Sequence, residues 1–209
     1  MTAADYARAS RLLARRDPVL RTLMQKYGPC RMARHQHTDP FQALIHAIIS
    51  QQLSTKAAAT IAARFASLFG STFPSPAQVA SMPDLPLRGV GLSGQKLGYL
   101  RDLCVRIQSG SLPLDDLERM SDDEVITVLT EVKGIGRWTA EMFLMFRLHR
   151  PDVLPVGDLG IVKAIQRNYR LRTEPTPARM TRIGEHWRPY RSIACWYLWR
   201  SLENAPLKD

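Results

Sequence analysis

An isolated aspartate and a glycine-rich turn are the features of this sequence best suited to chemistry. Asp158, in the segment PVGDLGIVKAIQ, stands directly before a stretch whose apolar residues recur at helical spacing. This pattern favours a helix N-cap. A catalytic role is compatible with it, because a carboxylate held at a helix N-terminus stays ionised and fixed in direction. The local sequence leaves both roles open.

The glycine-rich turn lies in the segment LTEVKGIGRWTAEMF at residues 129–143. Glycine is used where φ must be positive or where the backbone must approach another group closely. A helix opened by Trp138 would leave the amides of Gly134, Gly136 and Arg137 pointing outward at its N-terminus, where free N–H groups and the helix dipole favour an anion. A DNA phosphate is the natural candidate, and a simple capping turn is the alternative.

The elements that must position these residues are predicted to be helices throughout, so the fold class is all-α. Apolar residues recur at helical spacing, and no alternating pattern of strand length interrupts them. Asp-Pro pairs and capping serines mark several expected starts. The proline-rich run at residues 73–86 is expected to connect helices and to hold one short helix, and the segment around Pro175 and Pro177 is expected to be a linker. The helices with both ends predicted cover roughly residues 3–16, 18–27, 40–52, 55–69, 93–107, 159–169 and 189–202.

The composition fits a folded protein of the cytosol, and its positive charge suits a polyanionic partner. The chain has 209 residues, 45% of them hydrophobic, and a net charge of +10. Basic side chains that neutralise phosphates release condensed counterions, although charge alone is weak support for a nucleic-acid partner. Cys30, Cys104 and Cys195 match no metal-binding spacing. The first 16 residues lack the apolar core of a signal peptide, and no apolar run is long enough for a bilayer, so we expect no membrane partner.

The string L-x-x-V-x-G-I-G-R-W-T-A-x-x-F, followed by Asp158, resembles the signature of the helix-hairpin-helix DNA glycosylase superfamily. Its Arg-Trp-Thr-Ala variant is most similar to the 3-methyladenine DNA glycosylase II branch. The resemblance covers roughly residues 39–202 and is strongest over residues 129–163. It implies one catalytic unit, monomeric, with a substrate cleft between two helical lobes. The expected lobes are residues 39–150, which carry the hairpin, and residues 1–38 together with 151–209.

The resemblance also implies a substrate pocket around the acid. Asp158 would stabilise the oxocarbenium-like sugar as the N-glycosidic bond breaks. Trp138 stands where bifunctional members carry a Schiff-base lysine, so simple hydrolysis is expected, and its indole face suits a positively charged alkylpurine. Trp199 falls where the family places a second pocket aromatic, with core packing as an equal alternative. Met142 and Leu159 take pocket positions that are aromatic in the best-known member, which leaves the substrate range open.

The DNA contacts implied by the resemblance lie in a corner and in the hairpin. The run ISQQLS at residues 49–54 matches the family's wedge region, which fills the gap left by an extruded nucleotide. Gln52 is the first wedge candidate and Leu53 the second, although an ordinary corner between helices would read the same way. The predicted DNA-binding residues are Gln51, Gln52, Leu53, Gly134, Gly136, Arg137, Lys163 and Arg191.

We expect no cofactor other than a structural monovalent cation. The family hairpin can hold a monovalent cation on backbone carbonyls, which here would be those of Thr130, Val132 and Ile135. Some members carry an iron–sulfur cluster on four closely spaced C-terminal cysteines, but this chain ends in LWRSLENAPLKD, so no cluster is expected.

The sequence therefore predicts a monofunctional DNA glycosylase that removes alkylated purines, of the 3-methyladenine and 7-methylguanine type, from double-stranded DNA in base excision repair. It would work by base flipping, in the cytoplasm on nucleoid DNA. One alternative is a glycosylase of the same fold that acts on another damaged base. Another is a non-catalytic helix-hairpin-helix DNA-binding protein, which Asp158 argues against because a carboxylate near the phosphate-rich strand repels DNA.

Overall fold

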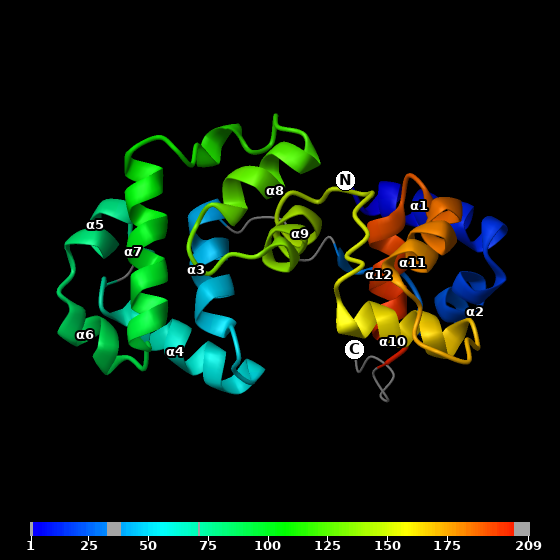
Figure 1. Ribbon diagram of the computed structural model, residues 1–209, viewed down its shortest axis with the longest axis horizontal. Coiled ribbons are helices and arrows are strands. Elements are labelled where there is room, and N and C mark those ends of the chain that lie inside the picture. Colours follow the sequence, from blue (N-terminus) through cyan, green and yellow to red (C-terminus); the bar gives the residue numbers. More distant parts are fainter. Residues whose placement is uncertain (1, 33–38, 71, 203–209) are drawn as a thin grey trace. The chain divides into compact units, whose positions relative to one another are not determined.

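The computed structural model describes residues 2–32, 39–70 and 72–202, and all regular structure in these ranges is helical, as predicted (Figure 1). None of the helices there is long and apolar enough to cross a membrane. The α-helices are α1 (Ala3–Arg16), α2 (Pro18–Tyr27), α3 (Pro40–Ser50), α4 (Thr55–Ser67), α5 (Pro76–Ser81), α6 (Asp84–Gly89), α7 (Gly94–Gln108), α8 (Asp122–Thr130), α9 (Arg137–Phe146), α10 (Leu159–Asn168), α11 (Pro177–Gly184) and α12 (Arg191–Arg200). The 3-10 helices include η2 (Leu114–Asp116) and η3 (Glu185–Trp187).

Capping side chains decide where most of these helices begin. In each case a side-chain oxygen accepts a hydrogen bond from a backbone N–H of the first turn, which has no partner within the helix. Proline stands in the first turn of α2, α3, α5 and α11, where its missing N–H removes no helical hydrogen bond. The capping residues are Thr2, Asp17, Asp39, Ser54, Ser75, Ser93, Ser121, Asp158 and Thr176.

Two predictions about proline-rich segments are corrected. Residues 73–86 hold α5 and the start of α6, where one short helix was expected. The expected linker around Pro175 and Pro177 contains the start of α11. In both places a Ser or Thr cap followed by proline begins a helix, so the prolines initiate helices there instead of ending them.

The chain divides into two compact units, His37–Phe143 and Met1–Gln36 with Leu144–Asp209. The second junction lies within α9, a few residues before the lobe boundary expected at residue 150. In the first of these units α7 lies beside α3, α5 and α6 (Figure 1). Its side chains Leu97, Leu100 and Leu103 are buried in the core of that unit.

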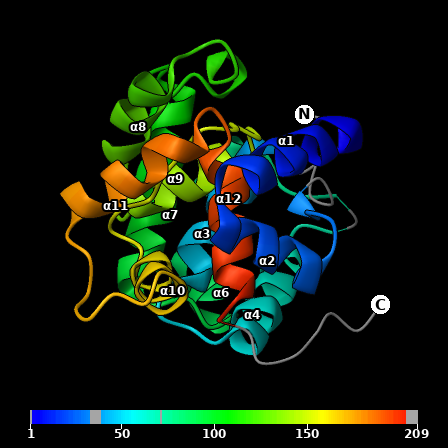
Figure 2. The same cartoon turned by 90° about the vertical axis from the view of Figure 1, so that its right-hand side faces the viewer.

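The other unit is built around α12, which lies beside α1, α2 and α10 (Figure 2). Asp17 is a buried centre of hydrogen bonds at the start of α2. Its carboxylate accepts the Tyr169 hydroxyl at 2.5 Å and the Trp187 indole N–H at 2.9 Å, in addition to two backbone amides of α2. These contacts join the start of α2 to the end of α10 and to η3 within the unit.

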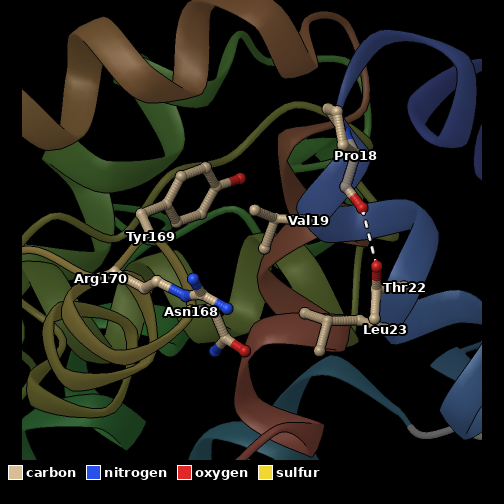
Figure 3. Close-up of a pocket in the computed structure, with 7 residues that line it drawn as sticks. All are labelled: Pro18, Val19, Thr22, Leu23, Asn168, Tyr169 and Arg170. Atoms are coloured by element: carbon tan, nitrogen blue, oxygen red, sulfur yellow. Dashed lines mark hydrogen bonds between the residues drawn. The ribbon is translucent and has the colours of Figure 1, made fainter.

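A cavity of about 450 Å³ lies in the same unit, where the start of α2 meets the end of α10 (Figure 3). Asp158 caps the opposite end of α10. The ten-residue helix between them is about 15 Å long, so the cavity is separate from the surroundings of Asp158. The cavity is lined by Pro18, Val19, Thr22, Leu23, Asn168, Tyr169 and Arg170.

Because several tyrosines of this unit are buried, we expect the free energy of unfolding to fall at alkaline pH. Burial raises the pKa of Tyr6 and of Tyr197 to about 12, and burial together with the Asp17 carboxylate raises the pKa of Tyr169. In the unfolded chain these hydroxyls ionise near pH 10, while the folded chain keeps their protons, so the folded state binds more protons above that pH. Their contribution to stability is present below about pH 10 and is lost as the pH rises towards 12. The midpoint of thermal unfolding should fall between about pH 10 and 12, and it should fall less steeply with pH in Tyr197→Phe than in the wild type. The same dependence of the midpoint on pH in both proteins would contradict the prediction.

Candidate active site

Asp158 is the N-cap of α10, as predicted. Its Oδ1 accepts the backbone N–H of Ile161 at 2.7 Å and the indole N–H of Trp199 at 2.9 Å. The residue is 8% exposed. Because two donors from different elements bind one oxygen, the plane of the carboxylate is fixed at the positive end of the helix dipole.

Trp199 holds this acid in place. The sequence was compatible both with a role in the substrate pocket and with core packing. In the structure the indole N–H of Trp199 donates to Asp158. Its ring lies partly buried against Phe146, with ring centroids 5.9 Å apart. An indole N–H is a donor only, so its direction is set by the Asp158 oxygen that accepts it.

Gly160 is a residue of this site that the sequence analysis missed. A Cβ added there would lie 2.9 Å from Asp158 Oδ1 and 3.0 Å from Trp199 Cδ1. The position therefore requires glycine if the hydrogen bond between acid and indole is to keep its geometry. The signal in the sequence was a glycine in the first turn of an otherwise regular helix, where glycine lowers helix stability.

The Gly-Ile-Gly turn connects α8 to α9, as predicted. Gly134 has a φ of 83°, and a Cβ there would come within 2.1 Å of the Tyr99 ring, so both the backbone conformation and the space require glycine. Gly136 has no positive φ, and nothing lies within 4 Å of a Cβ at that position. The backbone at Gly136 is therefore open to approach, and α9 begins at the next residue, Arg137.

Asp102 holds the turn from α7. Its Oδ2 accepts the backbone N–H of Lys133 at 2.9 Å and the Nε of Arg106 at 3.0 Å. Burial alone would raise the pKa of Asp102, but the Lys133 amide and the Arg106 guanidinium outweigh it and lower that pKa. Neither Tyr99 nor Asp102 was predicted to support the hairpin.

The corner between α3 and α4 brings two of the predicted DNA-binding segments together. The Gln51 side-chain amide donates to the Gly134 carbonyl at 2.7 Å, so it supports the hairpin from within the protein. Gln52 is exposed and has a φ of 57°, a left-handed conformation that is unfavourable for any residue with a Cβ. Such strain persists where surrounding contacts hold it, and it is concentrated at functional sites. Leu53, the second wedge candidate, is 39% exposed.

Residues 45–189 match the family pattern of the HhH-GPD superfamily of base excision DNA repair proteins. The chain belongs to this superfamily. It is 38% identical to DNA-3-methyladenine glycosylase 1 of Schizosaccharomyces pombe over 185 residues, which cover 88% of this chain and 80% of that protein. It is also 30% identical to the alkylbase DNA glycosidase-like protein mag2 of the same yeast, over 94% of each chain.

Two solved structures have the same fold. The S. pombe 3-methyladenine DNA glycosylase Mag1, in complex with abasic DNA, aligns with a TM-score of 0.81 at 35% identity, over 97% of this chain and 100% of that one. A DNA-3-methyladenine glycosidase from Bacillus halodurans aligns with a TM-score of 0.76, also at 35% identity, over 90% of each chain. The all-α HhH-GPD fold predicted from the sequence is thereby confirmed.

The HhH-GPD hairpin helix α9 carries two of the predicted pocket residues. Trp138 is 50% exposed and Met142 is partly buried, and their spacing of four residues places them on one face of the helix. Arg137, a predicted phosphate contact, pairs through its Nε with the buried Glu141 at 3.0 Å, while two thirds of its own side chain is exposed. The pairing leaves the arginine fixed at the helix N-terminus.

The other predicted contacts differ in accessibility. Lys163 is exposed on α10, and Leu159 is 71% exposed beside the acid. Arg191 is held by Asp152, whose Oδ1 lies 2.8 Å from the arginine Nε, and only 15% of the arginine side chain is exposed. Because this guanidinium already has a carboxylate partner and little exposed surface, we exclude Arg191 from the proposed phosphate contacts.

The predicted cation site concerns backbone carbonyls of the hairpin. The Val132 carbonyl accepts the Ile135 amide at 3.0 Å, and Thr130 is the last residue of α8. Among the residues that the structure describes, no cluster of three His, Cys, Asp or Glu side chains could hold a metal ion. A monovalent cation on the carbonyls of Thr130, Val132 and Ile135 stays a prediction.

Replacing Gly160 by alanine should impair catalysis more than folding. The added methyl group displaces either the Asp158 carboxylate or the Trp199 ring, and a misplacement of about 1 Å can lower a rate by about 10²-fold. We expect base release to fall about 10- to 100-fold, with a much smaller effect on lesion-independent DNA affinity. Gly157→Ala is the matched control, because nothing lies within 4 Å of a Cβ there. Equal rates in the two variants would show that the space at Gly160 is not needed.

Proposed function

We propose that this HhH-GPD protein is a monofunctional DNA glycosylase that hydrolyses the N-glycosidic bond of alkylated purines, of the 3-methyladenine and 7-methylguanine type, in double-stranded DNA. The observation that carries the proposal is the oriented carboxylate of Asp158, bound by Trp199 at the start of α10. The identity of 38% to an S. pombe protein named DNA-3-methyladenine glycosylase supports the choice of substrate.

Asp158 would act on the sugar. As the bond between C1′ and the purine nitrogen breaks, its electron pair leaves with the base and positive charge develops on the sugar ring. A fixed carboxylate stabilises that charge without having to reorient, and it can orient the water that adds to C1′. The products are the free base and an abasic nucleotide.

Trp138 would bind the damaged base. Alkylation at N3 or N7 gives the purine a positive charge, which an indole face attracts. The same charge makes the base a good leaving group, so the reaction has little need of a separate general acid. A tryptophan cannot form a Schiff base, and we therefore propose that the abasic strand is left uncut.

The remaining contacts would hold and open the duplex. The Gly134 and Gly136 amides would bind a phosphate at the start of α9, assisted by Arg137. Lys163 on α10 would contact another phosphate of the duplex. Gln52 would fill the gap left by the extruded nucleotide, with Leu53 as the second candidate. A monovalent cation on the hairpin carbonyls and a monomeric enzyme complete the proposal.

The experiment is base release from duplexes that carry methylated purines, uracil or a G·T mismatch, with the free bases identified by chromatography and the strands examined on denaturing gels. We expect free 3-methyladenine and 7-methylguanine, and strands that break only after hot alkali. If only another base were released, the protein would still be a glycosylase, but the proposed substrate class would be wrong. Binding to every duplex without any release would favour a non-catalytic DNA-binding protein.

A further inference from the structure

Lys96, on α7, binds the corner between α3 and α4. Its ammonium group donates to the carbonyl of Ile49 at 2.7 Å and to that of Gln51 at 2.8 Å. Ile49 lies in the last turn of α3, where carbonyls lack partners within the helix and where the dipole favours a cation. Lys96 is partly buried, so these two carbonyls replace part of the water that its charge would otherwise bind.

Gln52 lies next to the carbonyls that Lys96 holds. Gln52 follows Gln51 directly and has a φ of 57°, and the turn is closed by a hydrogen bond of 3.2 Å from the Leu53 amide to the Ser50 carbonyl. A left-handed residue with a Cβ persists only where its neighbours fix it. Lys96 fixes the two carbonyls on the N-terminal side of this residue, one of them in the peptide bond that Gln52 itself shares.

The same face of α7 also supports the hairpin. Tyr99 and Asp102 follow Lys96 at intervals of three residues, so the three side chains project from one side of the helix. Tyr99 fills the space beside Gly134, and Asp102 accepts the Lys133 amide. Together with the hydrogen bond from Gln51 to Gly134, these contacts hold the corner and the hairpin turn at a fixed separation.

We infer that Lys96 is a positioning residue for base extrusion: by holding the Ile49 and Gln51 carbonyls it keeps Gln52 in the left-handed conformation from which that side chain enters the duplex. The inference rests on the proposed glycosylase function, and it adds the residue that positions Gln52, the proposed wedge. Lys96 acts through Gln52, while the contacts of Tyr99 and Asp102 keep the phosphate-binding turn in register with the corner.

The test compares two duplexes that differ only opposite the lesion. In one a single 7-methylguanine is paired with cytosine, and in the other it faces an abasic nucleotide, where extrusion is easier because no base pair has to be broken. Single-turnover release is measured on both, and the ratio of the paired to the unpaired rate is taken for each variant. An inactive fraction of protein lowers both rates equally, so a purely structural defect leaves this ratio unchanged.

Lys96→Met removes the ammonium group and keeps a side chain of similar length. We expect it to lower the ratio about tenfold, and Lys96→Arg, which can still donate to both carbonyls, to restore most of it. Lys26→Met, in an exposed position on α2, removes the same charge from the chain and should leave the ratio at the wild-type value. A wild-type ratio in Lys96→Met, or an equal fall in Lys26→Met, would overturn the inference.

A second readout separates this inference from the proposed function. The fluorescence of 2-aminopurine beside a stable abasic analogue rises when a bound protein unstacks the site, and it requires no base release. If the wild-type protein raises this signal and frees no 7-methylguanine from either duplex, the proposed substrate fails while the inference is still tested. At saturating protein we expect a smaller rise with Lys96→Met than with Lys26→Met, and equal rises would overturn the inference.

Discussion

Asp158→Asn is expected to keep the fold and the affinity for duplex DNA, and to lower the rate of base release by on the order of 10³-fold. Asparagine is as good an N-cap as aspartate. Its amide oxygen can still accept the N–H groups of Ile161 and Trp199, which both meet a single oxygen of the acid. The substitution therefore removes mainly the negative charge, which is the property that stabilises a cationic sugar.

The measurement is single-turnover release of 7-methylguanine, together with the dissociation constant for the lesion duplex and the thermal unfolding midpoint. Asp158→Glu is a useful companion variant, because it keeps the charge and lengthens the side chain. We expect Glu to recover part of the activity that Asn loses. An Asn variant that releases the base within tenfold of the wild-type rate would remove Asp158 from catalysis.

Gly134→Ala is expected to disrupt the hairpin. An alanine at a φ of 83° is strained by about 1–2 kcal/mol, and its Cβ would lie 2.1 Å from a Tyr99 ring atom, which adds roughly 1–3 kcal/mol if the ring must move. The free energy of unfolding should fall by the sum of these two effects. Because the turn carries the amides proposed to bind phosphate, DNA affinity should fall as well. Chemical denaturation and a binding titration measure the two losses.

Gly136→Ala separates the two effects. A Cβ at that position meets nothing within 4 Å and the φ is not positive, so the free energy of unfolding should change little. If DNA approaches the backbone there, the added methyl group lowers DNA affinity without lowering stability. Tyr99→Ala in the Gly134→Ala background should recover the part of the stability lost to the clash. If Gly134→Ala and Gly136→Ala both matched the wild type in stability and in DNA affinity, the proposed role of the turn would be contradicted.

Helix starts were predicted correctly where a capping residue followed by proline was the only strong local pattern. Asp17 and Asp39, each followed by proline, were recognised as helix starts and cap their helices in the structure. The same pairing at Ser75 and Thr176 was obscured by further prolines nearby, which favoured a connector and a linker. The physical rule was the same in all four places, and only the neighbouring residues differed.

The motif residues of the site were predictable because their signals are local. Asp158 precedes a helix, and Gly134 needs a positive φ, so each leaves a mark within a few residues. The supporting residues leave no such mark. Lys96 binds carbonyls 47 and 45 residues away, and Asp102 binds an amide 31 residues away, so only the folded chain reveals these pairs.

Arg191 shows what a local signal leaves out. The sequence presented an arginine near the start of a C-terminal helix, which is a reasonable phosphate contact in a basic protein. Its carboxylate partner, Asp152, lies 39 residues earlier in the chain. A charge can be read from the sequence, but the residue that neutralises it cannot.

The most direct test of a catalytic carboxylate compares Asp158→Asn with Asp17→Asn. Asp17 also caps a helix and also accepts an indole N–H, from Trp187 at 2.9 Å, but it additionally accepts the Tyr169 hydroxyl. Asp17→Asn should lower the free energy of unfolding by about 1–3 kcal/mol and keep the wild-type rate of base release per folded molecule. Asp158→Asn should keep the wild-type free energy of unfolding and lose most of the rate of base release. Equal rates of release per folded molecule in the two variants would show that Asp158, like Asp17, only caps a helix.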